Sequence, residues 1–462
     1  MDIVRLIDKK VLSVVEKMYG FLGGEVDYQG FEIALKKELD ELGCQILKSA
    51  LEGADCGLRE SKERKKEWNL VRKNDLKTLL SPFGQFEYQR SYYRHKSDKS
   101  YSYLVDVQAG IKSHSRVSEN LKAELIDAAS VMSYEGATKE ISRFNATLKM
   151  SRQTVASSVQ NFSVQKDEPP QEKRKVRFLF IEADEDHVKI KGRKRTETRL
   201  IYVHEGVEEK PRRHLVNAHY FATTKKSPDQ HWHEVGEHIA MHYDLETIEQ
   251  IFLCGDGASW IKVGLEYIFG ATFVLDKFHL NKHIKEATGH VKEVAGQIRR
   301  GIWTLNQEAA LNGLRKAYSS ADTKARKERI ANTAKYIKNN WDGIVAQVRH
   351  PEVGCSAEGH ISHILAARMS TRPMAWSLTG ADNMSQMRTV RANGRSVKVA
   401  YLAGIEPAPL ITGLKEVAQK ELKNLRKRKS LGLESINNLP ILNGTNSFTT
   451  MALKSINKRI AI

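Results

Sequence analysis

The stretch "IFLCGDGASWI" (residues 251–261) changes character at a single aspartate. Its first four residues are apolar, as in a buried strand, and they end at Gly255-Asp256-Gly257 before a helix-like segment. The strand therefore carries one carboxylate to its own end. By frequency alone, such a triplet is a plain turn. Glycines on both sides would also let the chain turn sharply and leave clearance for a substrate or a metal ion.

Composition limits the classes of protein that the chain can belong to. The 462 residues suffice for about three domains, and 40% of them are hydrophobic, so a sizeable core can form. The 74 Lys and Arg against 56 Asp and Glu give a net charge of +18. Such an excess favours a polyanionic partner such as nucleic acid, although a merely basic surface gives the same number.

Cysteines and hydropathy argue against export and against a zinc ribbon. The four cysteines, at positions 44, 56, 254 and 355, form no C-x-x-C pair and are too few for a disulfide framework. No signal-peptide pattern and no run of about 18 apolar residues occurs. We therefore expect a soluble, cytoplasmic, nucleoid-associated protein without membrane contact.

The first third of the chain predicts a DNA-binding part. Residues 1–80 show helical spacing, and residues 84–106 predict a β-hairpin because aromatic residues alternate with polar ones. Residues 133–162 predict a helix, a turn and a second helix that Ser151 caps. Arg152 and Gln153 would face outward from that second helix. This resembles a helix-turn-helix, and an ordinary helical hairpin explains the same pattern. We predict one DNA-binding region over 81–165.

A polar linker with a Pro pair, residues 165–175, precedes strand-like sequence. Three antiparallel-looking strands, a helix, a strand, a helix and a strand follow, which predicts an α/β fold with a mixed sheet. This core would comprise 176–280 and 351–405. Residues 281–350 predict an all-helical insertion, and residues 406–462 a basic helical tail.

Four acids stand where strands end or helices begin. Asp184, Asp256 and Asp276 each follow an apolar run, and Glu358 opens a helix. In an open α/β sheet such positions converge on one crevice, where unpaired carboxylates repel one another. A divalent cation relieves that repulsion, and hard oxygen ligands suit Mg²⁺ or Mn²⁺. Two such ions, held by three carboxylates, support phosphoryl transfer.

The motifs, taken in this order, resemble those of DDE transposases, and more narrowly of the ISLre-two insertion-sequence family. Four segments carry most of the resemblance: "IEADEDHVKIKGRK" (181–194), "FLCGDGASWI" (252–261), "VLDKFHLNKHI" (274–284) and "CSAEGHISHILAARMSTRPMAWS" (355–377). Members of that family are often catalogued as uncharacterised UPF-type proteins, and mutator-like transposases are related to it. The resemblance implies a ribonuclease-H-like catalytic core preceded by a mainly helical DNA-binding region with a β-hairpin.

The resemblance also implies roles for single residues. Asp184, Asp256 and Glu358 would be the three catalytic acids and would bind, as metal ligands, two Mg²⁺ or Mn²⁺ ions. Asp276 and His279 match a (Cys/Asp)-x-x-His motif and would support the site. Asp186 is the main rival of Asp184 because alternation puts both on one face of the strand, and Glu182 is a weaker candidate.

Two further groups of side chains have more than one interpretation. His279 and His283 stand four residues apart, a spacing that can bind zinc, although surface or DNA-facing histidines fit the sequence better. Arg368 and Arg372 could contact DNA phosphates or form ordinary surface ion pairs.

The implied function is a transposase of a bacterial-type insertion sequence. It would bind double-stranded DNA at terminal inverted repeats and at the target, cleave and join strands, and act as a homodimer or higher homo-oligomer. Two alternatives remain from the sequence: an inactive or repurposed DNA-binding protein, and a metal-dependent nuclease that never joins strands.

Overall fold

The computed structural model describes residues 3–164, 169–193, 195–211, 213–372 and 374–407. The chain divides into two compact units after Leu121, the second of which is Lys122–Ile405. This boundary falls inside the region 81–165 for which the sequence predicts a single DNA-binding part. The predicted basic tail lies outside the described residues apart from positions 406 and 407, and so do residues 165–168 of the predicted linker.

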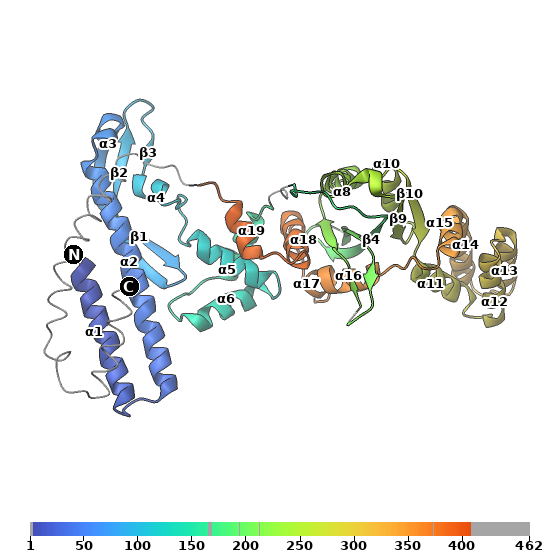
Figure 1. Cartoon of the computed structure of the whole chain (residues 1–462), viewed down its shortest axis with the longest axis horizontal. Coiled ribbons are helices and arrows are strands. Elements are labelled where there is room, and N and C mark those ends of the chain that lie inside the picture. Colours follow the sequence, from blue (N-terminus) through green and yellow to red (C-terminus); the bar gives the residue numbers. More distant parts are fainter. Residues whose placement is uncertain (1–2, 165–168, 194, 212, 373, 408–462) are drawn as a thin grey trace. The chain divides into compact units, whose positions relative to one another are not determined.

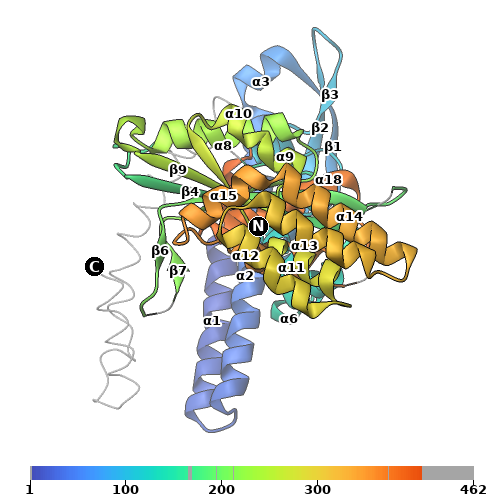
Figure 2. The same cartoon turned by 90° about the vertical axis from the view of Figure 1, so that its right-hand side faces the viewer.

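The first unit combines a long helical hairpin with a small antiparallel sheet. Its two long helices run side by side (Figure 2), and Lys10 Nζ lies 2.8 Å from Glu38 Oε2 between them. Leu58, Tyr88, Tyr93 and Val105 are buried together in its core. The elements are α1 (Ile3–Leu22), α2 (Tyr28–Glu60), α3 (Lys62–Glu67), β1 (Trp68–Ser81), β2 (Gly84–His95), β3 (Tyr101–Ser102) and α4 (Leu104–Gln108), with sheet order β1-β2-β3.

Two expectations for this unit need correction. The helix predicted over 1–80 is wrong from Trp68 onward, where β1 begins. Charged residues and two register shifts, between Leu70 and Arg72 and between Arg72 and Asp75, hide the period of two that marks a strand. The main partner of β2 is therefore β1, whereas the predicted pairing of β2 with the segment at Tyr101 covers only two residue pairs.

The second unit is a mixed α/β structure around a five-stranded sheet, as the sequence predicts. The order is β10-β9-β4-β5-β8; β4, β5 and β8 pair antiparallel, whereas β9 and β10 run parallel to β4. A two-stranded ribbon stands apart from it. The strands are β4 (Phe178–Lys189), β5 (Arg195–His204), β6 (Val207–Glu208), β7 (His214–Leu215), β8 (His219–Thr223), β9 (Gln250–Gly255) and β10 (Ala271–Leu275).

One face of this sheet is covered by a single long helix and three short ones. Alternate β4 residues, Leu179, Ile181 and Ala183, pack in one cluster with Trp232 of the long helix. The indole Nε1 of Trp232 donates to Trp260 O at 2.7 Å, which joins the long helix to the segment after β9. These elements are α8 (Pro228–His242), η1 (Leu245–Thr247), α9 (Ser259–Lys262) and α10 (Gly264–Tyr267).

The opposite face packs against helices from both ends of the unit. Leu200, Tyr202 and Tyr220 share a core cluster with Leu365 and Met384. The predicted helix-turn-helix segment lies in this layer, so it folds with the sheet. The helices are α5 (Glu119–Ala129), α6 (Tyr134–Phe144), α7 (Arg152–Gln160), α16 (Ala357–His360), the π-helical η2 (Ile361–Ala366), α17 (Ala367–Met369), α18 (Leu378–Ala392) and α19 (Val397–Ala403).

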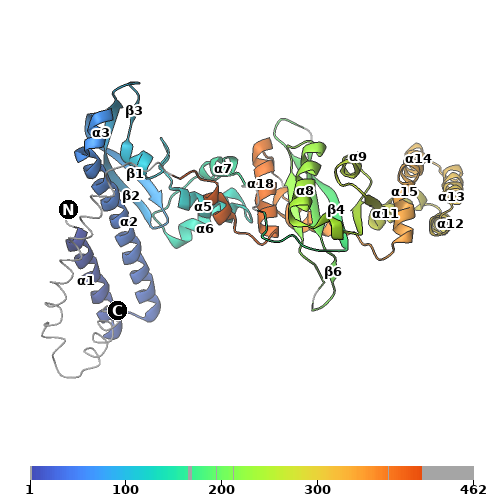
Figure 3. The same ribbon diagram turned by 45° about the horizontal axis from the view of Figure 1, so that its top comes forward.

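The helices predicted for the insertion are present and gather beyond edge strand β10 (Figures 1 and 3). They have a core of their own that includes Ile284, Ile298, Leu314 and Ile337. No helix in the described part of the chain is both long and apolar enough to span a bilayer. The insertion consists of α11 (Lys277–Thr288), α12 (Lys292–Trp303), α13 (Gln307–Ser319), α14 (Lys324–Asn339) and α15 (Trp341–Arg349).

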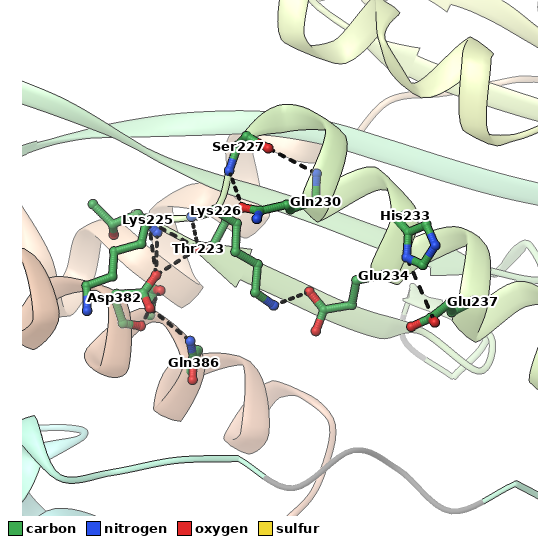
Figure 4. Close-up of polar contacts among 12 residues, drawn as sticks. Thr223, Lys225, Lys226, Ser227, Gln230, His233, Glu234, Glu237, Asp382 and Gln386 are labelled. Atoms are coloured by element: carbon green, nitrogen blue, oxygen red, sulfur yellow. Dashed lines mark hydrogen bonds and ion pairs between the residues drawn. The ribbon is translucent and has the colours of Figure 1, made fainter.

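A buried aspartate fixes α18 to the free edge of the sheet (Figure 4). Asp382 Oδ1 accepts hydrogen bonds from Thr223 Oγ1 at 2.7 Å, Thr224 N at 2.8 Å and Lys225 N at 3.1 Å. Gln386 Nε2 donates to Asp382 Oδ2 at 3.0 Å. A side-chain carboxylate therefore satisfies the backbone donors at the end of β8, and it ties two layers together.

Replacement of this anchor should weaken the second unit. Asp382→Ala leaves buried donors without partners, so we expect a loss of at least ~2 kcal/mol of stability, read as a lower urea midpoint. The matched control Gln386→Ala removes only one hydrogen bond to the same carboxylate and should cost ~1 kcal/mol or less. Equal urea midpoints for the two variants would contradict the role of Asp382 as the anchor between α18 and β8.

Candidate active site

Backbone pairing brings three aspartates to one level of the sheet. The parallel register pairs Glu182 with Cys254, and two residues further along the chain it sets Asp184 beside Asp256. The next pair of strands matches Gly255 with Leu275, which sets Asp256 beside Asp276, and Asp276 N donates to Gly255 O at 2.8 Å. Because neighbouring strands are about 4.8 Å apart, the three carboxylates leave the sheet close together.

Asp184 is buried where its charged form is unfavourable. It lies inside β4 with 8% of its surface exposed, and its Oδ1 accepts one hydrogen bond, from Glu185 N at 2.8 Å. Burial raises the pKa of Asp184 to about 7; the charges of Asp256 and Glu185 also raise it, whereas the backbone hydrogen bond and the charge of His279 lower it. An additional positive charge at this point would stabilise the carboxylate.

The turn that carries Asp256 is held by the helical insertion. Asp256 Oδ1 accepts from Ala258 N at 2.8 Å, and its carbonyl oxygen accepts from Tyr336 Oη at 2.7 Å. Gly257 has φ of +87°, and a Cβ there would lie 2.4 Å from Asn340 Oδ1. The prediction that the glycines leave clearance for DNA and metal is therefore wrong at Gly257, because Asn340 fills that space.

The other glycine of the triplet is also required by packing. A Cβ on Gly255 would lie 2.8 Å from Ile261 Cδ1 and 3.0 Å from Ala183 O. Here too the protein's own atoms fill the space that was predicted to be open to a substrate. Both glycines therefore let neighbouring elements close around Asp256.

Asp276 and His279 form a tight pair, as their spacing predicts. Asp276 caps α11 through Phe278 N at 3.0 Å, and its Oδ2 lies 2.7 Å from His279 Nδ1. This hydrogen bond raises the pKa of His279, and the charges of Asp184 and Asp256 add to the effect. His283, the other histidine of the possible zinc pair, stacks on Tyr336 with 4.1 Å between ring centroids.

Glu358 reaches the same group from the other side. It lies in α16, at a helix start as predicted, and 63% of its side chain is exposed. Its Oε2 is 4.0 Å from His279 Nε2. His279 thus lies between Asp276 and Glu358, and the raised pKa of its imidazole favours the charged form that would offset repulsion among the acids.

The structure distinguishes the rivals of Asp184 by position. Asp186 shares its strand face but lies two residues, about 7 Å, further along β4. The buried Oδ2 of Asp186 has no hydrogen-bond partner among the described residues. Glu182, in contrast, is fully engaged in hydrogen bonds within the protein. Register therefore favours Asp184 as the partner of Asp256, and Asp186 adds an unpaired oxygen nearby.

These groups fit a divalent cation. The chain offers hard carboxylate oxygens, a buried one without a partner, and an aspartate whose anion is destabilised by burial and by Asp256. Asp184 and Asp256 would hold the ion from the sheet. Glu358 on α16 would have to approach them, since among the described residues these acids form no group of three with ligand atoms within 4.8 Å.

A second group of possible metal ligands was not predicted from the sequence. Ligand atoms of Glu185, His187 and Glu197 lie within 4.8 Å of one another, and no other group of three such ligands in the described part of the chain does. Alternation along β4 puts Glu185 and His187 on the face opposite Asp184, and this pattern could have revealed them. Their acids are already engaged, since Trp260 Nε1 donates to Glu185 at 2.6 Å and Arg199 lies 3.3 Å from Glu197.

The residues predicted to contact DNA have different environments. Arg152 and Gln153 are exposed on α7 as expected, and Arg372 is exposed as well. Arg368 is buried: its Nε donates to Ala129 O at 2.8 Å, and burial lowers the pKa of its guanidinium to about 10. The phosphate contact predicted for Arg368 is therefore wrong, because this side chain holds α17 to α5.

Comparison with known proteins identifies the family of the chain. A family model described as "Uncharacterised protein family (UPF0236)" matches residues 25–402. Two UPF0236 proteins of Caldanaerobacter subterraneus subsp. tengcongensis are each 37% identical over 439 residues, which cover 93% of this chain and 93% and 87% of theirs. A third, 36% identical over 420 residues, has a name that joins eleven gene designations of that organism. The chain belongs to the UPF0236 family.

The raised pKa of Asp184 predicts how stability depends on pH. An unfolded aspartate releases its proton near pH ~3.9, whereas folded Asp184 keeps its proton to about pH 7. The folded chain thus binds more protons in this window, and stability falls as pH rises through it. In metal-free buffer at pH 8, the free energy of unfolding of Asp184→Asn should be at least ~1 kcal/mol higher than that of the wild type. This difference should shrink toward pH 4.

Urea unfolding at several pH values measures this difference. The control Asp322→Asn removes the same charge from an exposed pair with Arg326 and should change stability by less than ~1 kcal/mol across the range. A variant of Asp184 that is less stable than the wild type at pH 8 would refute the prediction.

A double-mutant cycle tests the packing of the insertion on the Asp256 turn. Gly257→Ala should cost ~2 kcal/mol or more, because of the contact with Asn340 and the positive φ. Asn340→Ala removes the obstructing atoms, so the double variant should be more stable than the sum of the single changes predicts. Strict additivity of the urea-derived free energies would show that the two residues do not meet.

Proposed function

We propose that this UPF0236 protein is a DDE-type transposase that binds the double-stranded ends of a mobile DNA element and cleaves and joins DNA strands. The observation that carries the proposal is the strand register that sets Asp184 beside Asp256, with Glu358 Oε2 4.0 Å from His279 next to Asp276. Asp184 lies on the central strand, Asp256 follows the neighbouring strand β9, and Glu358 begins α16. Gathering like charges in this way is costly without a cationic ligand.

Each residue of the site has a role in this chemistry. Asp184, Asp256 and Glu358 would hold the metal ions, and Asp276 orients His279 through its short hydrogen bond. His279 Nε2 lies 4.0 Å from Glu358 Oε2, so its ring stands between this exposed carboxylate and Asp276. When bound, a pair of Mg²⁺ or Mn²⁺ ions supplies Lewis-acid catalysis for phosphodiester hydrolysis and strand transfer.

The topology of the second unit supports a ribonuclease-H-like core. In chain order, three antiparallel strands are followed by a helix and by two strands parallel to the first, with the first strand at the centre. The first acid lies on the central strand, the second after the fourth strand, and the third after a helical insertion. This arrangement is the one that the resemblance to DDE transposases implies.

Charge and genomic copy number favour mobile DNA as the substrate. The net charge of +18 suits a phosphate backbone. The gene designations joined in one relative's name indicate many similar copies in a single genome, as a mobile element produces. Two element ends must be held together for strand transfer, so we propose a homodimer or larger homo-oligomer on DNA.

Replacement of the central acid tests this function. On a supercoiled plasmid with the element's ends, the protein should nick and join strands in Mg²⁺ or Mn²⁺. Asp256→Asn should lower the cleavage rate about a thousandfold, ~4 kcal/mol in barrier, while end binding changes less than about twofold.

The matched control is Asp322→Asn, which loses the same charge at an exposed position and should cleave normally. Normal cleavage by Asp256→Asn would refute the site. Wild-type binding without any nicking would favour a repurposed DNA-binding protein, and nicking without joined products would indicate a nuclease.

A further inference from the structure

Glu182 is a buried carboxylate that the proposed catalysis does not use. It lies on β4 two residues before Asp184 and is 2% exposed. Tyr202 Oη donates to its Oε2 at 2.6 Å, and His204 Nε2 lies 3.0 Å from its Oε1; both partners are on β5. Ser356 adds its backbone N–H and its hydroxyl. Glu182 thus joins the centre of the sheet to the turn two residues before Glu358.

We propose that Glu182 is a positioning residue that sets the place of Glu358 by holding the Cys355-Ser356 turn against the sheet. Its catalytic consequence rests on the function proposed above. Glu182 is thereby linked to two of the proposed metal ligands. It stands two residues before Asp184 on β4, and it hydrogen-bonds Ser356, which stands two residues before Glu358.

The start of α16 depends on this contact because it lacks an ordinary cap. Within the described chain, Ser356 does not use its hydroxyl to cap α16, although serine commonly does so at this position. The hydroxyl instead lies 3.2 Å from Glu182 Oε2 and 3.0 Å from Tyr202 Oη. The first turn of the helix is therefore held by the sheet.

One turn later, His360 extends the same contact. His360 Nδ1 is 3.2 Å from Tyr202 Oη and 3.0 Å from Ser356 O, and its ring lies 4.6 Å from that of Tyr202. Ser356 and His360, which stand two residues before and two residues after Glu358, both contact the hydroxyl of Tyr202, and this hydroxyl donates to Glu182. The π-helical η2 then follows directly, so the segment has an irregular backbone that packing must define.

Glu358 needs such support from outside its own side chain. Its side chain is largely exposed and is 4.0 Å from His279, which is longer than a hydrogen bond. It also follows the whole helical insertion in the chain and lies in a short helix, not on a strand of the sheet. A small displacement of a catalytic group is enough to lower a rate strongly.

Hydrogen exchange tests the positioning directly in the full-length protein. Glu182→Gln keeps the side-chain volume but replaces one acceptor oxygen by a donor, which opposes the N–H of Ser356 or the hydroxyl of Tyr202. We expect amides of residues 354–366 to exchange at least tenfold faster than in the wild type, while those of α8 keep their rates. The control Glu249→Gln, at an exposed pair with Arg177, should leave both segments unchanged.

Steady-state cleavage of DNA ends supplies the catalytic readout. Glu182→Gln should lower kcat by ten- to a hundredfold with KM for DNA nearly unchanged, and Ser356→Ala should lower kcat less, because its N–H remains. A general loss of folding would instead change KM and the exchange of α8 as well.

Unchanged exchange at 354–366 in Glu182→Gln would overturn the proposal, and so would faster exchange there with an unchanged kcat. If the wild type cleaves no DNA in Mg²⁺ or Mn²⁺, the proposed function fails. The exchange measurement then still decides whether Glu182 holds the turn.

Discussion

Hydrogen bonding between β4, β9 and β10 determines where the acidic groups of this protein meet. The parallel register places Asp184, Asp256 and Asp276 beside one another, and a shift by one residue would turn one of them to the other face. Burial of Asp184 opposes folding with this group charged, as its raised pKa indicates, and the charge of Asp256 adds to the effect. The strands keep this arrangement because their apolar residues are buried on both faces of the sheet.

Three contacts hold the rest of the site to this sheet. His279 is fixed by Asp276, the turn at Asp256 by Tyr336 of the insertion, and the helix of Glu358 by Glu182. The insertion therefore does more than separate the second and third acids in the chain, since α14 packs on the turn that carries one of them. Rigid support of this kind is what a site of converging like charges requires.

Local pattern predicted the acids and most of the elements, because the apolar runs before Asp256 and Asp276 mark strand ends. The strand end expected at Asp184 was wrong, since β4 continues through this residue to Lys189. The mixed sheet and the helices of the insertion also followed from periodicity. Features that depend on partners distant in the chain could not be predicted. Examples are the need for glycine at 257, which comes from Asn340, and the burial of Arg368 against α5. The strand at Trp68 was missed because charges and register shifts interrupt its alternation.

Diffraction from crystals soaked in Mn²⁺ and recorded at the manganese absorption edge tests the central claim most directly. We predict an anomalous peak from a Mn²⁺ ion that is bound by Asp184 and Asp256, with the Glu358 carboxylate closer to the aspartates than in the metal-free structure. Asp184→Asn should abolish this peak. A peak confined to Glu185, His187 and Glu197 on the other face of the sheet would contradict the account.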